Sequence, residues 1–168
     1  MRKLRTVVPL VVGCLAFVGC APSASTAAVV NGQVFTEKQL DAVADGCASV
    51  FSAETPLTLR TAALTNVVVG MLGDQINEAN GLQLTDGERQ QFLQSSAQGR
   101  AMLSDPECAK VATGLASYLL GADRLGQQVY QDALDAASIE VNPRYGTWDR
   151  DTGAISGSGS LSSELTQS

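Results

Sequence analysis

Histidine, the side chain on which most acid–base and nucleophilic sites depend, does not occur in this chain of 168 residues. Without it, Ser-His-Asp and Cys-His catalytic arrangements cannot form, and neither can zinc or iron sites built on imidazole. Cys47 and Cys108 are too far apart for a CxxC redox motif, and no glycine-rich phosphate loop is present. The residue types therefore predict a protein that is not an enzyme and that uses no cofactor.

One short segment has the carboxylate spacing that begins a calcium loop. Asp149 and Asp151 alternate before Gly153. A complete loop needs another ligand before the glycine and a glutamate about six residues after it, and both are missing. A solvated turn rich in aspartate is the better interpretation, so the sequence predicts no metal site.

The first twenty residues indicate where the protein is located. Three of the first five residues are basic, residues 6–18 are apolar and uncharged, and Gly19 precedes Cys20. This order is typical of a secretory signal peptide, which is too short to form a stable transmembrane helix.

Residues 17–20 resemble a bacterial lipobox, in which the cysteine is diacylated and becomes the new N-terminus. We therefore expect a signal peptide over residues 1–19 and a short lipidated tether over residues 20–26. Several fatty-acyl chains of the palmitate type on Cys20 would anchor the lipoprotein stably on the outer face of the cell membrane.

Two other cleavage sites remain open. An overlapping lipobox pattern ends at Cys14, but it leaves a very short apolar region. An ordinary secreted protein would be cut a few residues after Cys20, for instance after Ala21 or Ala24.

Removal of residues 1–19 would leave two cysteines that are not lipidated, Cys47 and Cys108. An oxidising compartment favours a disulfide between them. That bridge would close a loop of about 60 residues, which stabilises a fold by on the order of 4 kcal/mol in the chain-entropy model. Two buried free thiols are the alternative.

The mature chain would be strongly acidic. Residues 1–19 hold three of the 11 basic residues and no acidic residue, which leaves 8 basic against 17 acidic residues and a net charge of −9. Such a charge argues against nucleic acid and against docking to anionic lipid by charge. The low aromatic content of 5% makes an aromatic-lined pocket for a small-molecule substrate less favourable.

Apolar periodicity and capping residues predict a mainly α domain with four to five helices. Threonine caps and prolines mark the helix starts, and glycines inside the last helix suggest close helix crossings. The expected helices cover residues 37–51, 56–79, a short polar stretch after Thr85, and a longest helix over 106–137.

Extended segments lie at both ends of this domain. Residues 27–35 contain the turn signal Asn31-Gly32 between β-branched residues, and residues 139–142 are extended before a proline. We expect them to pair as a small two-stranded clasp that joins the N- and C-terminal ends. The glycine- and serine-rich residues 150–168 are expected to form a disordered tail.

The segment Ala28-Val29-Val30-Asn31-Gly32-Gln33-Val34-Phe35-Thr36-Glu37 resembles the opening of SurA/PrsA-class extracytoplasmic chaperones. Residues 140–149, with the sequence Glu-Val-Asn-Pro-Arg-Tyr-Gly-Thr-Trp-Asp, resemble the closing strand of actinobacterial lipoproteins of this type. The resemblance implies a SurA N-terminal-like domain over residues 27–149. The parvulin prolyl isomerase domain of full-length family members has no counterpart here, in agreement with a protein that is not an enzyme.

The resemblance implies a non-catalytic, membrane-anchored chaperone module that binds unfolded or extended exported polypeptides. Tyr145 and Trp148 are candidates for the client-binding surface, and packing of the clasp onto the helices is the alternative role for both. An accessory envelope lipoprotein that binds one specific protein partner is the alternative function.

Overall fold

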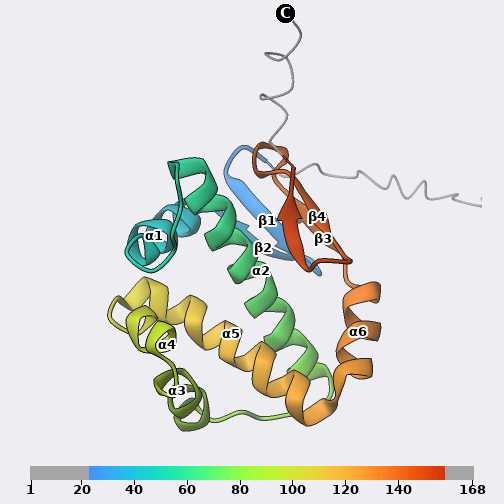
Figure 1. Cartoon of the computed structure of the whole chain (residues 1–168). Coiled ribbons are helices and arrows are strands. Elements are labelled where there is room, and N and C mark those ends of the chain that lie inside the picture. The colour runs from blue at the N-terminus through green and yellow to red at the C-terminus, as the bar shows by residue number, and fades with distance from the viewer. Residues whose placement is uncertain (1–22, 158–168) are drawn as a thin grey trace, which may run out of the picture.

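The computed structural model describes residues 23–157. Helices predominate, and a small region of antiparallel strands lies at one end of the molecule (Figure 1). The helices are α1 (Glu37–Cys47), α2 (Pro56–Ala79), α3 (Asp86–Gln94), α4 (Ala97–Met102), α5 (Pro106–Leu125) and α6 (Gln127–Ala136). The strands are β1 (Thr26–Val30), β2 (Gln33–Thr36), β3 (Ile139–Val141), β4 (Thr147–Asp149) and β5 (Ala154–Ser156), with a 3-10 turn η1 (Pro143–Tyr145) between β3 and β4.

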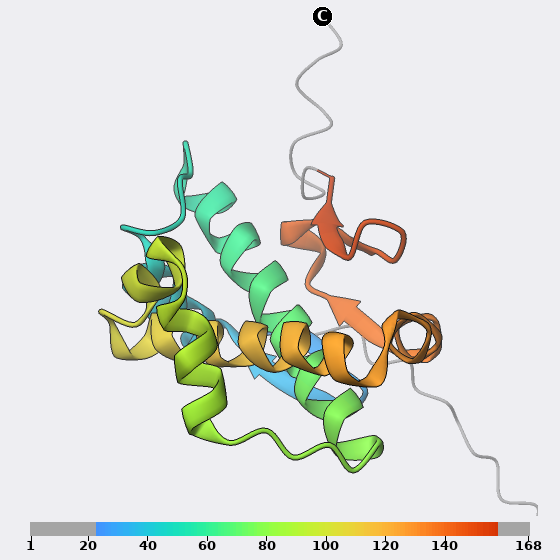
Figure 2. The ribbon, with the colours of Figure 1, turned by 60° about the horizontal axis from the view of Figure 1, so that its bottom comes forward.

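The crossing of α2 and α5 is the centre of the fold (Figures 1 and 2). A methyl group on Gly70 would lie 3.0 Å from the Cα atom of Gly114, so the two backbones approach closely where these glycines meet. The expected close helix crossing is confirmed at Gly114. Around it, α2 buries Leu64, Val68 and Leu72 in the apolar core.

Threonine side chains begin three of the helices, as the sequence predicts. Thr36, Thr55 and Thr85 each accept a hydrogen bond from the backbone N–H three residues on, and the side chain of that third residue bonds the threonine backbone in return. These reciprocal bonds satisfy N–H groups that have no partner inside the helix. They explain why α1, α2 and α3 begin where they do.

The cap of α3 makes a testable pH-dependent contribution to stability. Glu88 accepts from the Thr85 N–H at 2.7 Å and from Arg124 Nη2 at 2.6 Å. The Thr85 backbone bond, followed by the Arg124 bond, lowers the pKa of Glu88 from 4.5 to about 2. A lowered carboxyl pKa stabilises the fold above the unfolded-state value, and that stabilisation is lost as pH falls through the folded-state value.

We therefore expect Glu88→Ala to unfold more easily than wild type above about pH 5, with a difference that shrinks steadily towards pH 2. Urea denaturation at a series of pH values measures it. Glu88→Gln, which keeps an acceptor for the Thr85 N–H but has no charge, is the control and should differ from wild type by an amount that depends less on pH. A Glu88→Ala difference that is constant from pH 7 to pH 2 would contradict the assignment.

The N- and C-terminal ends of the domain meet in one antiparallel sheet with strand order β2-β1-β3. β1 pairs with β3 through Ala28 opposite Val141, Val29 opposite Glu140 and Val30 opposite Ile139. The expected clasp between the two ends is thus confirmed, but it has three strands instead of two. The third strand is β2, because the Asn31-Gly32 turn, with φ values of 49° and 84°, folds it back on β1.

Three predicted boundaries are wrong. The first helix ends at Cys47 and not at residue 51, and the short helix α4 was not expected. The helix expected over 106–137 is interrupted at Gly126, where φ is +90°, so that α2 with 24 residues is longer than α5 with 20. A positive φ is readily adopted only by glycine, and here it turns the chain into α6.

The ordered domain also continues beyond residue 149. β4 and β5 form a hairpin in which Trp148 lies opposite Ile155, and the Ile155 N–H donates to Thr65 Oγ1 of α2. The tail expected from residue 150 is therefore wrong for residues 150–156. The signal peptide, Cys14, Cys20, and residues 158–168 of the tail lie outside the described residues.

The disulfide predicted from the cysteine count is present between Cys47 and Cys108. Cys47 is the last residue of α1 and Cys108 lies in the first turn of α5, and both are fully buried. The bridge therefore ties α1 to the helix that crosses beneath it.

Candidate functional site

Tyr145, one of the two aromatic residues predicted to contact clients, is only 2% exposed. Its hydroxyl donates to Glu37 Oε2 at 2.6 Å and accepts from Arg60 Nη2 at 2.7 Å. Burial, followed by the bond to Glu37, raises the pKa of Tyr145. A client-binding role for Tyr145 is wrong, because the side chain is enclosed and its polar atom is already bonded.

The same contacts explain why Tyr145 is held there. Arg60 also bonds Glu37 at 2.7 Å, and Asn142 Nδ2 donates to Glu37 Oε1 at 3.4 Å. The cluster thereby connects the first residue of α1, the start of α2 and the segment around η1. Packing of the closing segment onto the helices, the alternative role, is confirmed for Tyr145.

Trp148, the second candidate, is half-buried and packs against the core from β4. It also lines an open depression of about 470 Å³ with residues of β3, η1 and the β4–β5 hairpin, among them Ile139, Val141 and Arg150. Arg150 is occupied there, since its guanidinium donates to the Ala137 and Asp135 carbonyls. Trp148 therefore has a structural contact and a surface that faces solvent.

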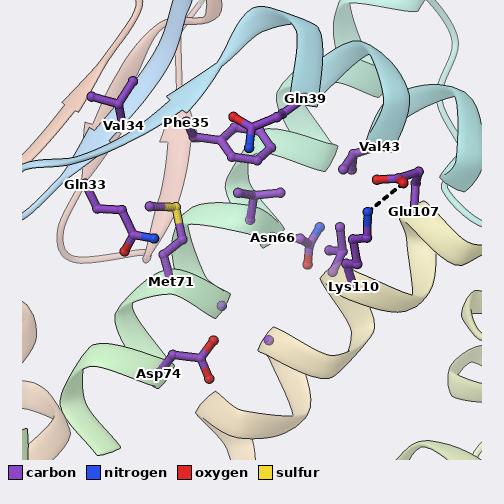
Figure 3. A pocket seen from close by; sticks show the side chains of 14 residues that line it. Gln33, Val34, Phe35, Gln39, Val43, Asn66, Met71, Asp74, Glu107 and Lys110 are labelled. Carbon is purple, nitrogen blue, oxygen red and sulfur yellow. Dashed lines mark hydrogen bonds and ion pairs between the residues drawn. The ribbon is translucent and has the colours of Figure 1, made fainter. Parts of the chain in front are cut away.

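A different groove, between β2, α1, α2 and α5, is the best candidate for a binding site (Figure 3). Its volume is about 310 Å³, near the lower end of ordinary ligand sites. In Figure 3 Phe35 from β2 and Met71 from α2 point towards its interior. The apolar lining is Val34, Phe35, Val43, Val67, Met71 and Val111, and the glycines at the helix crossing, Gly70 and Gly114, complete it.

The groove exists because of those two glycines. Side chains at Gly70 and Gly114 would collide with the opposite backbone, and their absence leaves space between α2 and α5. Phe35 is brought to the opposite wall by the Asn31-Gly32 turn, which places β2 beside β1. Sequence reasoning missed this site, although the turn signal and the glycines were both visible in the sequence.

Amide side chains border the groove. Gln39 Oε1 caps the Thr36 N–H at 2.9 Å, Gln33 Oε1 accepts from Gln75 Nε2 at 3.0 Å, and Asn66 Nδ2 donates to the Ala62 carbonyl at 2.8 Å. Within residues 23–157, the Gln33 and Gln39 amide N–H groups and the Asn66 carbonyl have no such bond. They can bond a backbone N–H or C=O of a bound chain.

Charged groups lie on the same border. Lys110 Nζ bonds Glu107 Oε1 at 2.6 Å, whereas Asp74 is exposed and makes no ion pair with any described residue. The border therefore has one uncompensated negative charge. It contains no histidine or cysteine, and the arrangement favours binding over chemistry at a substrate bond.

Large exposed apolar side chains do not form one broad surface. Val34, Leu57, Phe92 and Leu119 are more than a third exposed, and they belong to β2, α2, α3 and α5 respectively. Over residues 23–157 no three metal-ligating side chains come together. In the same part of the chain, none of the helices combines the length and apolarity needed to cross a membrane.

Comparison with known proteins adds no relative: neither the family models, nor the curated proteins, nor the solved structures contain a match to this chain.

Proposed function

We propose that this protein is a non-catalytic, chaperone-like module that binds unfolded or extended exported polypeptides in the groove between β2, α1, α2 and α5. In this proposal Cys20 is lipidated and holds the protein at the outer face of the cell membrane. The resemblance of residues 28–37 and 140–149 to SurA N-terminal-like domains supports it. No cofactor, nucleic acid or small-molecule substrate takes part.

The observation that carries the proposal is the composition of the groove. An apolar interior of about 310 Å³ accommodates one or two aliphatic side chains, and unused amide groups on its border suit a polypeptide backbone. So small a site gives weak binding, which suits a protein that must release its clients without an energy source.

A light-scattering assay tests this function. Residues 20–168 carrying Cys20→Ser, which contain the whole described fold, are added at increasing ratio to a client protein that aggregates on heating. We expect aggregation to fall as the ratio rises. No suppression at several-fold excess would contradict the proposal, and crosslinking in cells would then search for the single partner of an accessory envelope lipoprotein.

Two glutamine variants connect the activity to the groove. Met71→Gln places a polar amide in the groove and should reduce suppression severalfold. Leu119→Gln makes the same kind of change at an apolar residue of α5 that is 49% exposed and outside the groove, and it should leave suppression unchanged. Equal activity of the two variants would exclude the groove as the binding site.

A further inference from the structure

The outer edge of β2 is open. β1 lies between β2 and β3, so β2 has a neighbouring strand on one side only. Its sequence, Gln33-Val34-Phe35-Thr36, contains no charged residue and no proline, the devices by which proteins usually protect a strand edge from further pairing. Val34, in the middle of this edge, is 53% exposed.

The hairpin register determines which backbone groups face this edge. A two-residue turn at Asn31-Gly32 makes Val30 and Gln33 the hydrogen-bonded pair that closes the hairpin. Val29 and Val34 then form the next, non-bonded pair. The N–H and C=O of Val34 consequently point away from β1, towards the open edge.

The groove lies directly beside this edge. Figure 3 shows Val34 and Phe35 on β2 along one border of the groove and Lys110 of α5 on the other. A strand added to β2 extends the sheet over the groove. The residue opposite Val34 shares the outward face of Val34, so its two neighbours direct their side chains inward.

Charge indicates what kind of segment fits. Asp74 has no ion pair among the described residues, while the positive charge of Lys110 is paired with Glu107. The whole chain is also acidic. An apolar segment flanked by lysine or arginine is therefore favoured over one flanked by acidic residues.

We propose that an extended apolar segment with flanking basic residues, within an exported polypeptide, pairs antiparallel with β2 at Val34 and places side chains in the groove. This inference rests on the proposed function and specifies how a client is held. Only the two backbone hydrogen bonds of Val34 are available, so each contact is short and weak and depends on the backbone more than on one sequence.

The probe is a peptide of lysine-valine-threonine-valine-lysine with both ends capped. Titration into the ¹⁵N-labelled chain of residues 20–168, carrying Cys20→Ser, gives the dissociation constant from amide shifts. The threonine should lie opposite Val34, so methylation of its nitrogen should weaken binding about tenfold. Methylation of a valine nitrogen, which points away from β2, is the matched control and should have little effect.

Two substitutions of Val34 test the same contact on the protein. Val34→Pro removes an N–H that bonds nothing in β1, so the fold should survive while binding weakens about tenfold. Val34→Ala keeps the N–H and should bind within about threefold of wild type. Thermal unfolding of both variants shows that the comparison is between folded proteins.

Charge is tested separately. Wild type should prefer the lysine-flanked peptide to a glutamate-flanked one, and Asp74→Asn should reduce that preference. Equal effects of the threonine and valine methyl groups, or unchanged binding by folded Val34→Pro, would overturn pairing with β2. If wild type and Val34→Pro suppress client aggregation equally, the strand pairing fails while the proposed function stands, and if wild type does not suppress it, the proposed function itself fails.

Discussion

Removal of the Cys47–Cys108 disulfide is expected to lower the free energy of unfolding by about 4 kcal/mol, the largest effect predicted for any change in this fold. The bridge joins residues 61 positions apart, and without it the unfolded chain regains the freedom of that whole loop. Both cysteines are fully buried, so Cys47→Ala with Cys108→Ala avoids burial of a hydroxyl group.

Thermal unfolding of residues 20–168 carrying Cys20→Ser is the measurement. The double variant should melt on the order of 10–20 °C below the parent. Reduction of the parent should reproduce most of this shift, while reductant should not affect the double variant. Mass spectrometry of the untreated parent should show the loss of two hydrogens. Free thiols in that protein, or a loss below about 1 kcal/mol, would contradict a disulfide that constrains the fold.

Local signals explain what the sequence predicted well. Threonine caps depend on a side chain and a backbone N–H three residues apart, and Thr36, Thr55 and Thr85 start their helices as expected. The Asn31-Gly32 turn is equally local. Pairing of β1 with β3 was accessible because few other extended segments were available to pair with residues 139–142.

Helix interruptions depend on tertiary packing and were missed. Apolar residues recur through 106–137 with helical spacing, and Gly126 alone does not show whether a helix continues or turns. The turn is favoured in the fold because it brings Tyr130 of α6 back against α2, where its hydroxyl donates to Asn77 Oδ1 at 2.7 Å in a buried site. No pattern within α5 or α6 contains that partner.

The candidate site was predicted least well, for a physical reason. An aromatic residue near a proline can be buried or exposed, and only the positions of Glu37 and Arg60, more than 80 residues away from Tyr145, decide that its hydroxyl lies inside. The groove also depends on an absence, since Gly70 and Gly114 form it by having no side chain where two helices cross. Helical spacing places each glycine on a helix but does not show that the two face each other.

Gly73→Ala is expected to destabilise the fold by about 2–3 kcal/mol, even though alanine is the better helix former by about 1 kcal/mol. A methyl group at this position would lie 2.6 Å from Tyr118 Cα and 2.7 Å from Tyr118 N. These are backbone atoms of α5 and cannot rotate away, so the helices must separate. Chemical denaturation measures the loss.

Gly87→Ala is the matched control, because the same methyl group in α3 would meet only Thr85 Oγ1 at 3.9 Å. It should leave stability unchanged or raise it by up to about 1 kcal/mol. Equal effects of the two changes would show that α2 and α5 are not in close contact. Gly73 lies one turn from Gly70, so separation of the helices there also alters the groove. In a Gly73→Ala protein kept folded at low temperature, weaker peptide binding is therefore expected, which connects the close helix crossing to the proposed client site.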